Sequence, residues 1–171
     1  NNMYQDCWIV KLDSLGNKIW DKTFGGSSSD HANSIIQTSD GGYLFAGYTS
    51  SGDGDITDGN NGESDGWVVK LDNLGNKLWD KTFGGSASDR ATSIQETSDG
   101  GFILSGMTFS NDGDISDGNN GGRDCWIIKL DLNGNKVWDK TFGGSDADET
   151  ASIQQTSDGN YIIAGLTQSN N

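Results

Sequence analysis

Two short stretches of the chain concentrate the side chains that could bind a metal ion. They run from residue 53 to 62 and from 112 to 121, and each holds three aspartates and two asparagines between glycines. Carboxylate and amide oxygens are the ligands that Ca²⁺ prefers, in shells of about six to eight. Glycines let the backbone turn several oxygens inward. The sequence predicts a calcium ion in each loop, with these ligands: Asp53, Asp55, Asp58 and Asn60 in the first, and Asp112, Asp114, Asp117 and Asn119 in the second.

The alternative interpretation is a solvated turn region, because turns by themselves favour Asp, Asn and Gly. The spacing differs from that of an EF-hand loop: the middle gap is one residue longer, and no Glu stands at the twelfth position. The flanking Asp65 and Asp124 could add a ligand. Mg²⁺ fits less well because it needs a strict octahedron, and soft metals lack His or Cys ligands here. We expect calcium to be structural, neutralising carboxylates that otherwise repel one another.

Other candidate chemistry is sparse. His31 is the only histidine, and the matching positions further along the chain hold Arg90 and Glu149. A position that accepts three different charges is typical of exposed surface, so a catalytic triad has no support. Cys7 and Cys125 also occupy matching positions, without the C-x-x-C spacing of a redox or metal site. We expect both to be small packing residues, and we expect no enzymatic activity.

The net charge of −14 and pI near 4.1 exclude some classes of partner. Phosphate backbones would be repelled, so we expect no nucleic acid. No run of 18 apolar residues occurs, so we expect no membrane insertion.

The elements that position the loops form an internal repeat. Asp6, Asp65 and Asp124 each begin a copy of one unit at a spacing of 59 residues. We therefore treat residues 1–171 as a single repeat domain with units 6–64, 65–123 and 124–171. A period of this length indicates a stacked or ring-shaped repeat architecture.

Each unit reads as four short strands, with no helical periodicity. In the first full copy these are residues 32–38, 43–49, 67–72 and 77–83, joined by an Asp-Gly-Gly turn, the acidic loop and an Asn-Leu-Gly-Asn turn. Alternation of apolar residues and glycine-containing turns is typical of antiparallel hairpins. Four antiparallel strands per repeat predict the blades of a β-propeller.

The repeated motifs carry a resemblance to a known family. Gly-Gly-Ser-x-x-Asp, Thr-Ser-Asp-Gly-Gly and Trp-x-x-Lys-Leu-Asp-x-x-Gly-Asn-Lys-x-Trp resemble the β-propeller repeats of bacterial secreted and surface proteins. The Leu-Asp-x-x-Gly-x-x-x-Trp part is also similar to blades of quinoprotein dehydrogenases, in which such tryptophans dock neighbouring blades. The resemblance implies an all-β propeller, located outside the cell or on its surface. It implies no particular ligand, since one fold hosts many functions.

By this interpretation the chain begins with the third and fourth strands of one blade and ends with the first and second strands of another. Propellers have about four to eight blades, so we expect self-association: either two chains complete one ring, or the chain belongs to a longer array.

The expected function is a calcium-stabilised, non-enzymatic structural, adhesive or binding scaffold, with a glycan or a surface protein as possible partner. The alternatives are a lectin-like or carbohydrate-active module and a building block of an extracellular filament.

Overall fold

The computed structural model describes residues 4–170, which form twelve strands and no helix. None of these residues therefore forms a helix that could cross a membrane. Residues 1–3 and 171, the outer limits of the expected domain, lie outside the described part.

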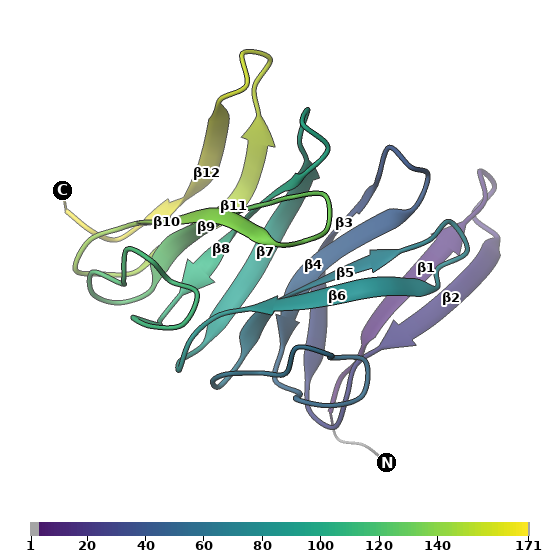
Figure 1. Ribbon diagram of the computed structural model, residues 1–171, viewed down its shortest axis with the longest axis horizontal. Helices are drawn as coiled ribbons and strands as arrows, with labels where there is room; N and C mark the ends of the chain where they lie inside the picture. The colour runs from purple at the N-terminus through teal and green to yellow at the C-terminus, as the bar shows by residue number, and fades with distance from the viewer. Residues whose placement is uncertain (1–3, 171) are drawn as a thin grey trace.

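The strands form four antiparallel sheets that follow one another along the chain (Figure 1). The two complete sheets are β3 (Asp30–Gln37), β4 (Tyr43–Thr49), β5 (Asp65–Leu71) and β6 (Lys77–Phe83), then β7 (Asp89–Glu96), β8 (Phe102–Thr108), β9 (Asp124–Leu130) and β10 (Lys136–Phe142). A pair of strands precedes them, β1 (Cys7–Leu12) and β2 (Lys18–Phe24), and another pair follows, β11 (Asp148–Gln155) and β12 (Tyr161–Thr167). Each complete sheet is a meander of four strands in chain order.

This arrangement confirms the all-β class and the four strands of each unit. The first and third strands of a unit begin two residues earlier than expected, at Asp30 and Asp65. Both residues pair in register with Thr49 at the end of β4, so the ladder extends to the rim of the sheet. Between hairpin strands the turns use glycines with positive φ, such as Gly75 at 80°, a conformation that glycine adopts without steric cost.

The first strands of successive sheets lie against one another. β3 contacts β7, and β7 contacts β11. The Asn33 side chain donates to the Ala91 carbonyl at 2.8 Å, and one repeat later Thr92 donates to the Thr150 carbonyl at 2.9 Å. The same type of bond thus links each sheet to the next at the same place.

Apolar clusters fill the space between neighbouring sheets. Trp67 and Trp126, on the third strands, are 0% and 2% exposed and lie in two of these clusters. On the outer strands Trp20 packs edge-on against Tyr43 of the next sheet at 5.8 Å. The expected role of the tryptophans in packing neighbouring sheets is confirmed for these residues.

The third strands of the two complete sheets, β5 and β9, are buried on both faces, which simple alternation does not predict. In β5 even Lys70 is only 5% exposed. Its aliphatic stem lies in the interior, and its ammonium pairs with Asp40 of the hairpin turn at 2.8 Å. Hydrogen bonds from Lys70 and Thr38 lower the pKa of Asp40 to about 2.

Cys7 and Cys125 are both free and buried, as expected for packing residues. Burial raises the pKa of each thiol to about 12, with nearby aspartates adding to the effect. Both thiols are therefore protonated and unreactive at neutral pH.

Candidate functional site

The two acidic loops leave β4 and β8 and fold back against the Gly-Gly-Ser links that join one sheet to the next. Asp53 accepts a hydrogen bond from the Ser27 amide at 2.7 Å, and Asp55 accepts one from the Gly25 amide at 3.2 Å. The second loop repeats this geometry: Asp112 accepts from Ser86 at 2.7 Å and Asp114 from Gly84 at 3.2 Å. The loops and the links therefore lie at the same end of the sheets, as the strand order predicts.

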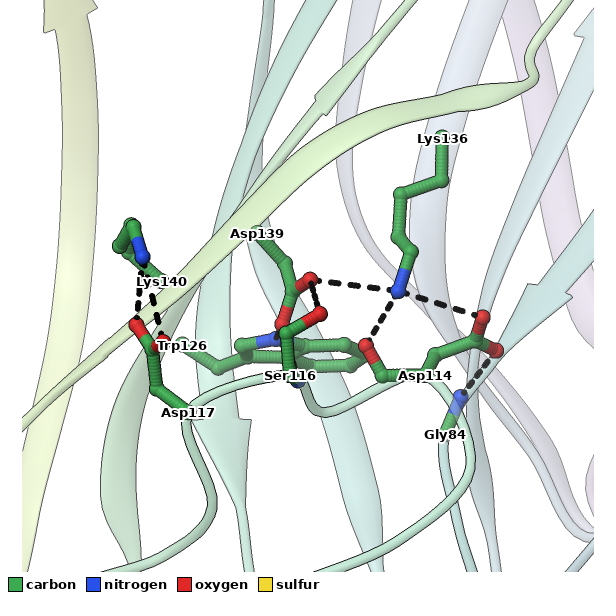
Figure 2. A network of polar contacts seen from close by, with 8 residues as sticks. All are labelled: Gly84, Asp114, Ser116, Asp117, Trp126, Lys136, Asp139 and Lys140. Carbon is green, nitrogen blue, oxygen red and sulfur yellow. Dashed lines mark hydrogen bonds and ion pairs between the residues drawn. The ribbon is translucent and has the colours of Figure 1, made fainter.

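The third aspartate of each loop faces a lysine on an outer strand. Asp58 pairs with Lys81 at 3.1 Å, and Asp117 pairs with Lys140 at 2.9 Å. Figure 2 shows the second of these pairs beside the contacts of Asp114 and Lys136. The asparagines bond locally: Asn60 accepts from the Gly62 amide at 2.9 Å, and Asn119 from the Gly121 amide at 2.8 Å.

Within each loop the predicted calcium ligands thus bond three different kinds of partner: backbone amides of the link, a lysine on the outer strand, and a backbone amide of the loop itself. Residues 4–170 contain no group of three or more His, Cys, Asp or Glu side chains placed to hold a metal ion. The donors have the oxygen chemistry that calcium needs, but their side chains do not converge here. Calcium binding stays a prediction.

A second layer of interactions fixes each loop to the outer strand of its sheet. Asp139 on β10 accepts bonds from the Ser116 amide at 2.9 Å and from the Ser116 hydroxyl at 2.6 Å. It also accepts from the Trp126 indole at 3.2 Å and pairs with Lys136 at 3.2 Å (Figure 2). These hydrogen bonds lower the pKa of Asp139 although its burial opposes ionisation. The carboxylate therefore acts as an anchor for the loop.

The glycines of the links are required by space. At Gly85 an added Cβ would collide with the Asp112 carboxylate and would lie 2.8 Å from the Ser110 Cβ. At Gly26 the equivalent atom would meet Asp53 at 2.5 Å and the Ser51 Cβ at 2.7 Å. Only glycine lets the aspartates approach the backbone amides this closely, which explains why the acidic loops and the Gly-Gly pairs occur together.

Each link also contains a buried aspartate that opens the next sheet. Asp30 and Asp89 are 1% and 0% exposed. Asp89 accepts from the Gly85 amide at 2.8 Å and from the Ser110 hydroxyl at 2.7 Å. Asp30 makes the matching bonds to Gly26 and Ser51 at 2.8 and 3.0 Å. The link aspartates therefore hold the backbone of the glycine pair against the start of the next sheet.

Asp65, at the start of β5, stands out among the buried carboxylates of the described residues because it accepts a single hydrogen bond and its pKa is shifted. One of its oxygens accepts from the Asn61 amide at 2.8 Å, while the other is buried without a hydrogen-bond partner. Burial raises the pKa of Asp65 to about 6, and the charges of Asp89 and Asp114 add to the rise. Asp124 has the same arrangement one repeat later, with Asn120 as its partner at 2.8 Å. From the sequence both are predicted only as possible extra ligands.

One further cluster lies near the rim of the sheets, at positions where the residue differs from repeat to repeat. The Tyr48 ring stacks on His31 with centroids 4.6 Å apart, and the Arg90 guanidinium lies 4.5 Å from the Tyr48 centroid. His31 is half-buried, which differs from the exposed surface expected for this position. The stack with Tyr48 accounts for the difference.

The fold and the loops define an all-β repeat protein made of antiparallel sheets. Comparisons with the models of known families and with curated proteins find no match. Among solved structures, the chain is similar to a protein of unknown function from Bacteroides caccae, with a TM-score of 0.55 and 13% identity. The match covers 95% of this chain and 47% of the other, so this chain spans about half of that protein's length. The likeness concerns the fold alone.

Proposed function

We propose that this chain is a non-enzymatic scaffold whose successive sheets are blades of a β-propeller. The observation that carries the proposal is the set of hydrogen bonds between each acidic loop and its Gly-Gly-Ser link, which we call the clasp and which is repeated in two units. Gly25 bonds Asp55 and Gly84 bonds Asp114 at the same 3.2 Å, and Ser27 and Ser86 bond their aspartates at the same 2.7 Å. The carboxylates that could do chemistry are thus used to hold backbone in place, identically in two repeats.

The blade arrangement is supported by the contacts between first strands. β3, β7 and β11 follow one another side by side, while the fourth strands β6 and β10 end their sheets on the other edge. Sheets that share a line of first strands and are joined by short links suit radial repetition, which leaves only protected edges. The secreted or surface location rests on the resemblance of the repeat motifs.

Such a scaffold would present the rim that carries the loops and links to a protein or a glycan. The net charge of −14 bears on the choice of partner, because long-range repulsion disfavours acidic ones. The Tyr48 ring is covered by His31 and Arg90, so its face is not free to stack on a sugar in this conformation.

The test combines a glycan array with a panel of glycoside hydrolysis assays on the purified chain. The scaffold proposal expects no turnover of any glycan. Turnover that survives repeated purification would overturn it and favour the carbohydrate-active alternative. Saturable binding of one glycan class without turnover would assign a lectin-like role to the same scaffold.

A further inference from the structure

The two terminal half-sheets expose apolar side chains that are buried in the complete sheets. On β12, Ile162 is 61% exposed and Ile163 is 36% exposed. Ile103, the residue of β8 that matches Ile162, is 0% exposed. On β1, Leu12 is 53% exposed, whereas its counterpart Leu71 is 0% exposed. Large exposed apolar patches mark interaction sites.

Trp8 is the clearest of these exposed residues. It is 64% exposed, while Trp67 and Trp126, one and two repeats later, are 0% and 2% exposed. Its indole is nevertheless held as theirs are: Trp8 donates to Asp21 at 3.1 Å, and Lys18 pairs with Asp21 at 2.9 Å. The Trp8 ring is therefore held in the orientation of the buried tryptophans although it is itself exposed. Such pre-orientation lowers the entropic cost of binding.

A matching cavity lies at the other end of the molecule. A hollow of about 300 Å³ is lined by Cys125, Phe142, Thr150, Ile163 and Gly165. The corresponding place one repeat earlier is lined by the matching residues, among them Gly66, Phe83, Ala91, Leu104 and Gly106. There only about 10 Å³ is left open, because Trp126 and Ile128 of β9 complete the lining.

A second hollow lies at the first half-sheet, where a side chain of the last half-sheet would fill it. A space of about 290 Å³ lies between β1 and β3, lined in part by Ile9 and Ile35. Ile35 is 47% exposed, whereas its counterparts Ile94 and Ile153 are 3% and 5% exposed. Ile153 shares a buried cluster with Ile103, and the residue that matches Ile103 on the last strand is the exposed Ile162.

We propose that a second copy of this chain docks here, with its β1 pairing antiparallel to β12 and its Trp8 entering the hollow beside Gly165. The register follows from β8 and β9, in which Gly106 pairs with Trp126 and Ile103 pairs with Lys129. It places Gly165 opposite Trp8 and Ile162 opposite Lys11 of the second copy. The inference goes beyond the proposed function and needs only the repeat geometry.

The occupant is a second copy because the two half-sheets of one chain lie at opposite ends of the molecule (Figure 1). Their charges are also complementary. Residues 143–170 carry four acids and no base, whereas residues 7–24 carry three lysines and two aspartates. Charge complementarity favours this pairing over that of two like ends. Two reciprocal junctions would give two chains six four-stranded sheets, within the usual range for propellers.

The first test measures mass in solution by light scattering and sedimentation over a wide range of concentration. The proposal expects a mass of two chains for the wild type. Trp8→Ala removes the central apolar anchor, and we expect the dissociation constant to rise about 30-fold or more. The matched control is Leu15→Ala, since Leu15 is 84% exposed and its counterpart Leu74 is 63% exposed; it should leave the mass unchanged.

The second test fixes the register. A chain carrying both Ile162→Cys and Lys11→Cys should form disulfide-linked dimers under mild oxidation, because these positions face each other across the junction. A chain carrying Ile162→Cys and Leu15→Cys should not. The wild type, whose cysteines are Cys7 and Cys125, serves as the control for linkage through the native thiols.

Each outcome decides the proposal. A single-chain mass at every concentration would overturn it. A dimer that Trp8→Ala leaves intact would overturn the role of the hollow. Open-ended polymers lost in Trp8→Ala would support the junction but overturn the closed pair.

Discussion

Asp65→Asn should stabilise the protein at pH 8 and leave it unchanged at pH 4. The carboxylate is 0% exposed, and one of its oxygens has no hydrogen-bond partner. An amide in this place keeps the oxygen that accepts from Asn61 and removes a charge that faces Asp89 and Asp114. A neutral side chain should therefore suit the site better than an ionised one.

The magnitude follows from the pKa. The value rises from 3.8 to about 6 in the fold, and one pKa unit corresponds to about 1.4 kcal/mol. Keeping Asp65 ionised thus costs at most about 3 kcal/mol, and relaxation of the site reduces this. We expect a gain of about 1–2 kcal/mol at pH 8, which for a chain of this size raises Tm by about 2–8 °C.

The sign of the pH dependence is fixed by the same shift. Between pH 3.8 and about 6 the folded state binds more protons at Asp65 than the unfolded state does. Stability from this group is therefore present at low pH and is lost as the pH rises through 6. The variant lacks this loss, so its advantage should grow from pH 4 to pH 8.

Urea unfolding at pH 4, 6 and 8 measures the effect. The control is Asp72→Asn in an exposed hairpin turn, where hydrogen bonds from Asn76 lower the pKa of the carboxyl; this variant should lose stability above pH 4. An Asp65→Asn variant no more stable than the wild type at pH 8 would refute the reasoning.

Three further predictions concern the links, the loops and the buried lysine. Gly85→Ala should lower the free energy of unfolding by about 2–4 kcal/mol, because its Cβ collides with Asp112; Gly52→Ala, with open space around it, should be nearly neutral in the same urea assay. Calcium at 100 times its dissociation constant in both loops should add about 5 kcal/mol and raise Tm by about 10 °C or more, a gain that a chelator should remove; a Tm that calcium and chelator leave unchanged to within about 2 °C would contradict the predicted sites. Lys70→Met should change stability by less than about 1.5 kcal/mol because the apolar volume is kept, and a loss above about 3 kcal/mol in thermal unfolding would show that the pair with Asp40 matters more.

Much of this fold could be predicted from the repeat. The period of 59 residues, the glycine turns and the alternating apolar residues located every strand to within two residues. The burial of both faces of β5 could not be predicted in this way, since Lys70 has the polar character of an exposed position. Its burial depends on Asp40, which lies 30 residues away and is brought close only by the β4–β5 pairing.

The candidate site was harder to predict for a physical reason. Composition identifies oxygen donors but cannot show whether their side chains converge on an ion or separate toward amides and lysines. Asp53 and Asp58 lie in one short loop, yet one reaches the Ser27 amide and the other Lys81. The signal for the clasp was the Gly-Gly-Ser motif, which recurs with the loops, but its partners are set by the packing of one sheet on the next.

Hydrogen exchange at the backbone amides of β12 tests the central claim most directly, because that strand has a free edge in one chain and two neighbours in the proposed pair. The account predicts that, at concentrations where two chains associate, β12 amides exchange as slowly as those of β8, and that Trp8→Ala restores fast exchange. Fast exchange along β12 at every concentration, with β8 protected throughout, would contradict the docking of a second copy at this edge.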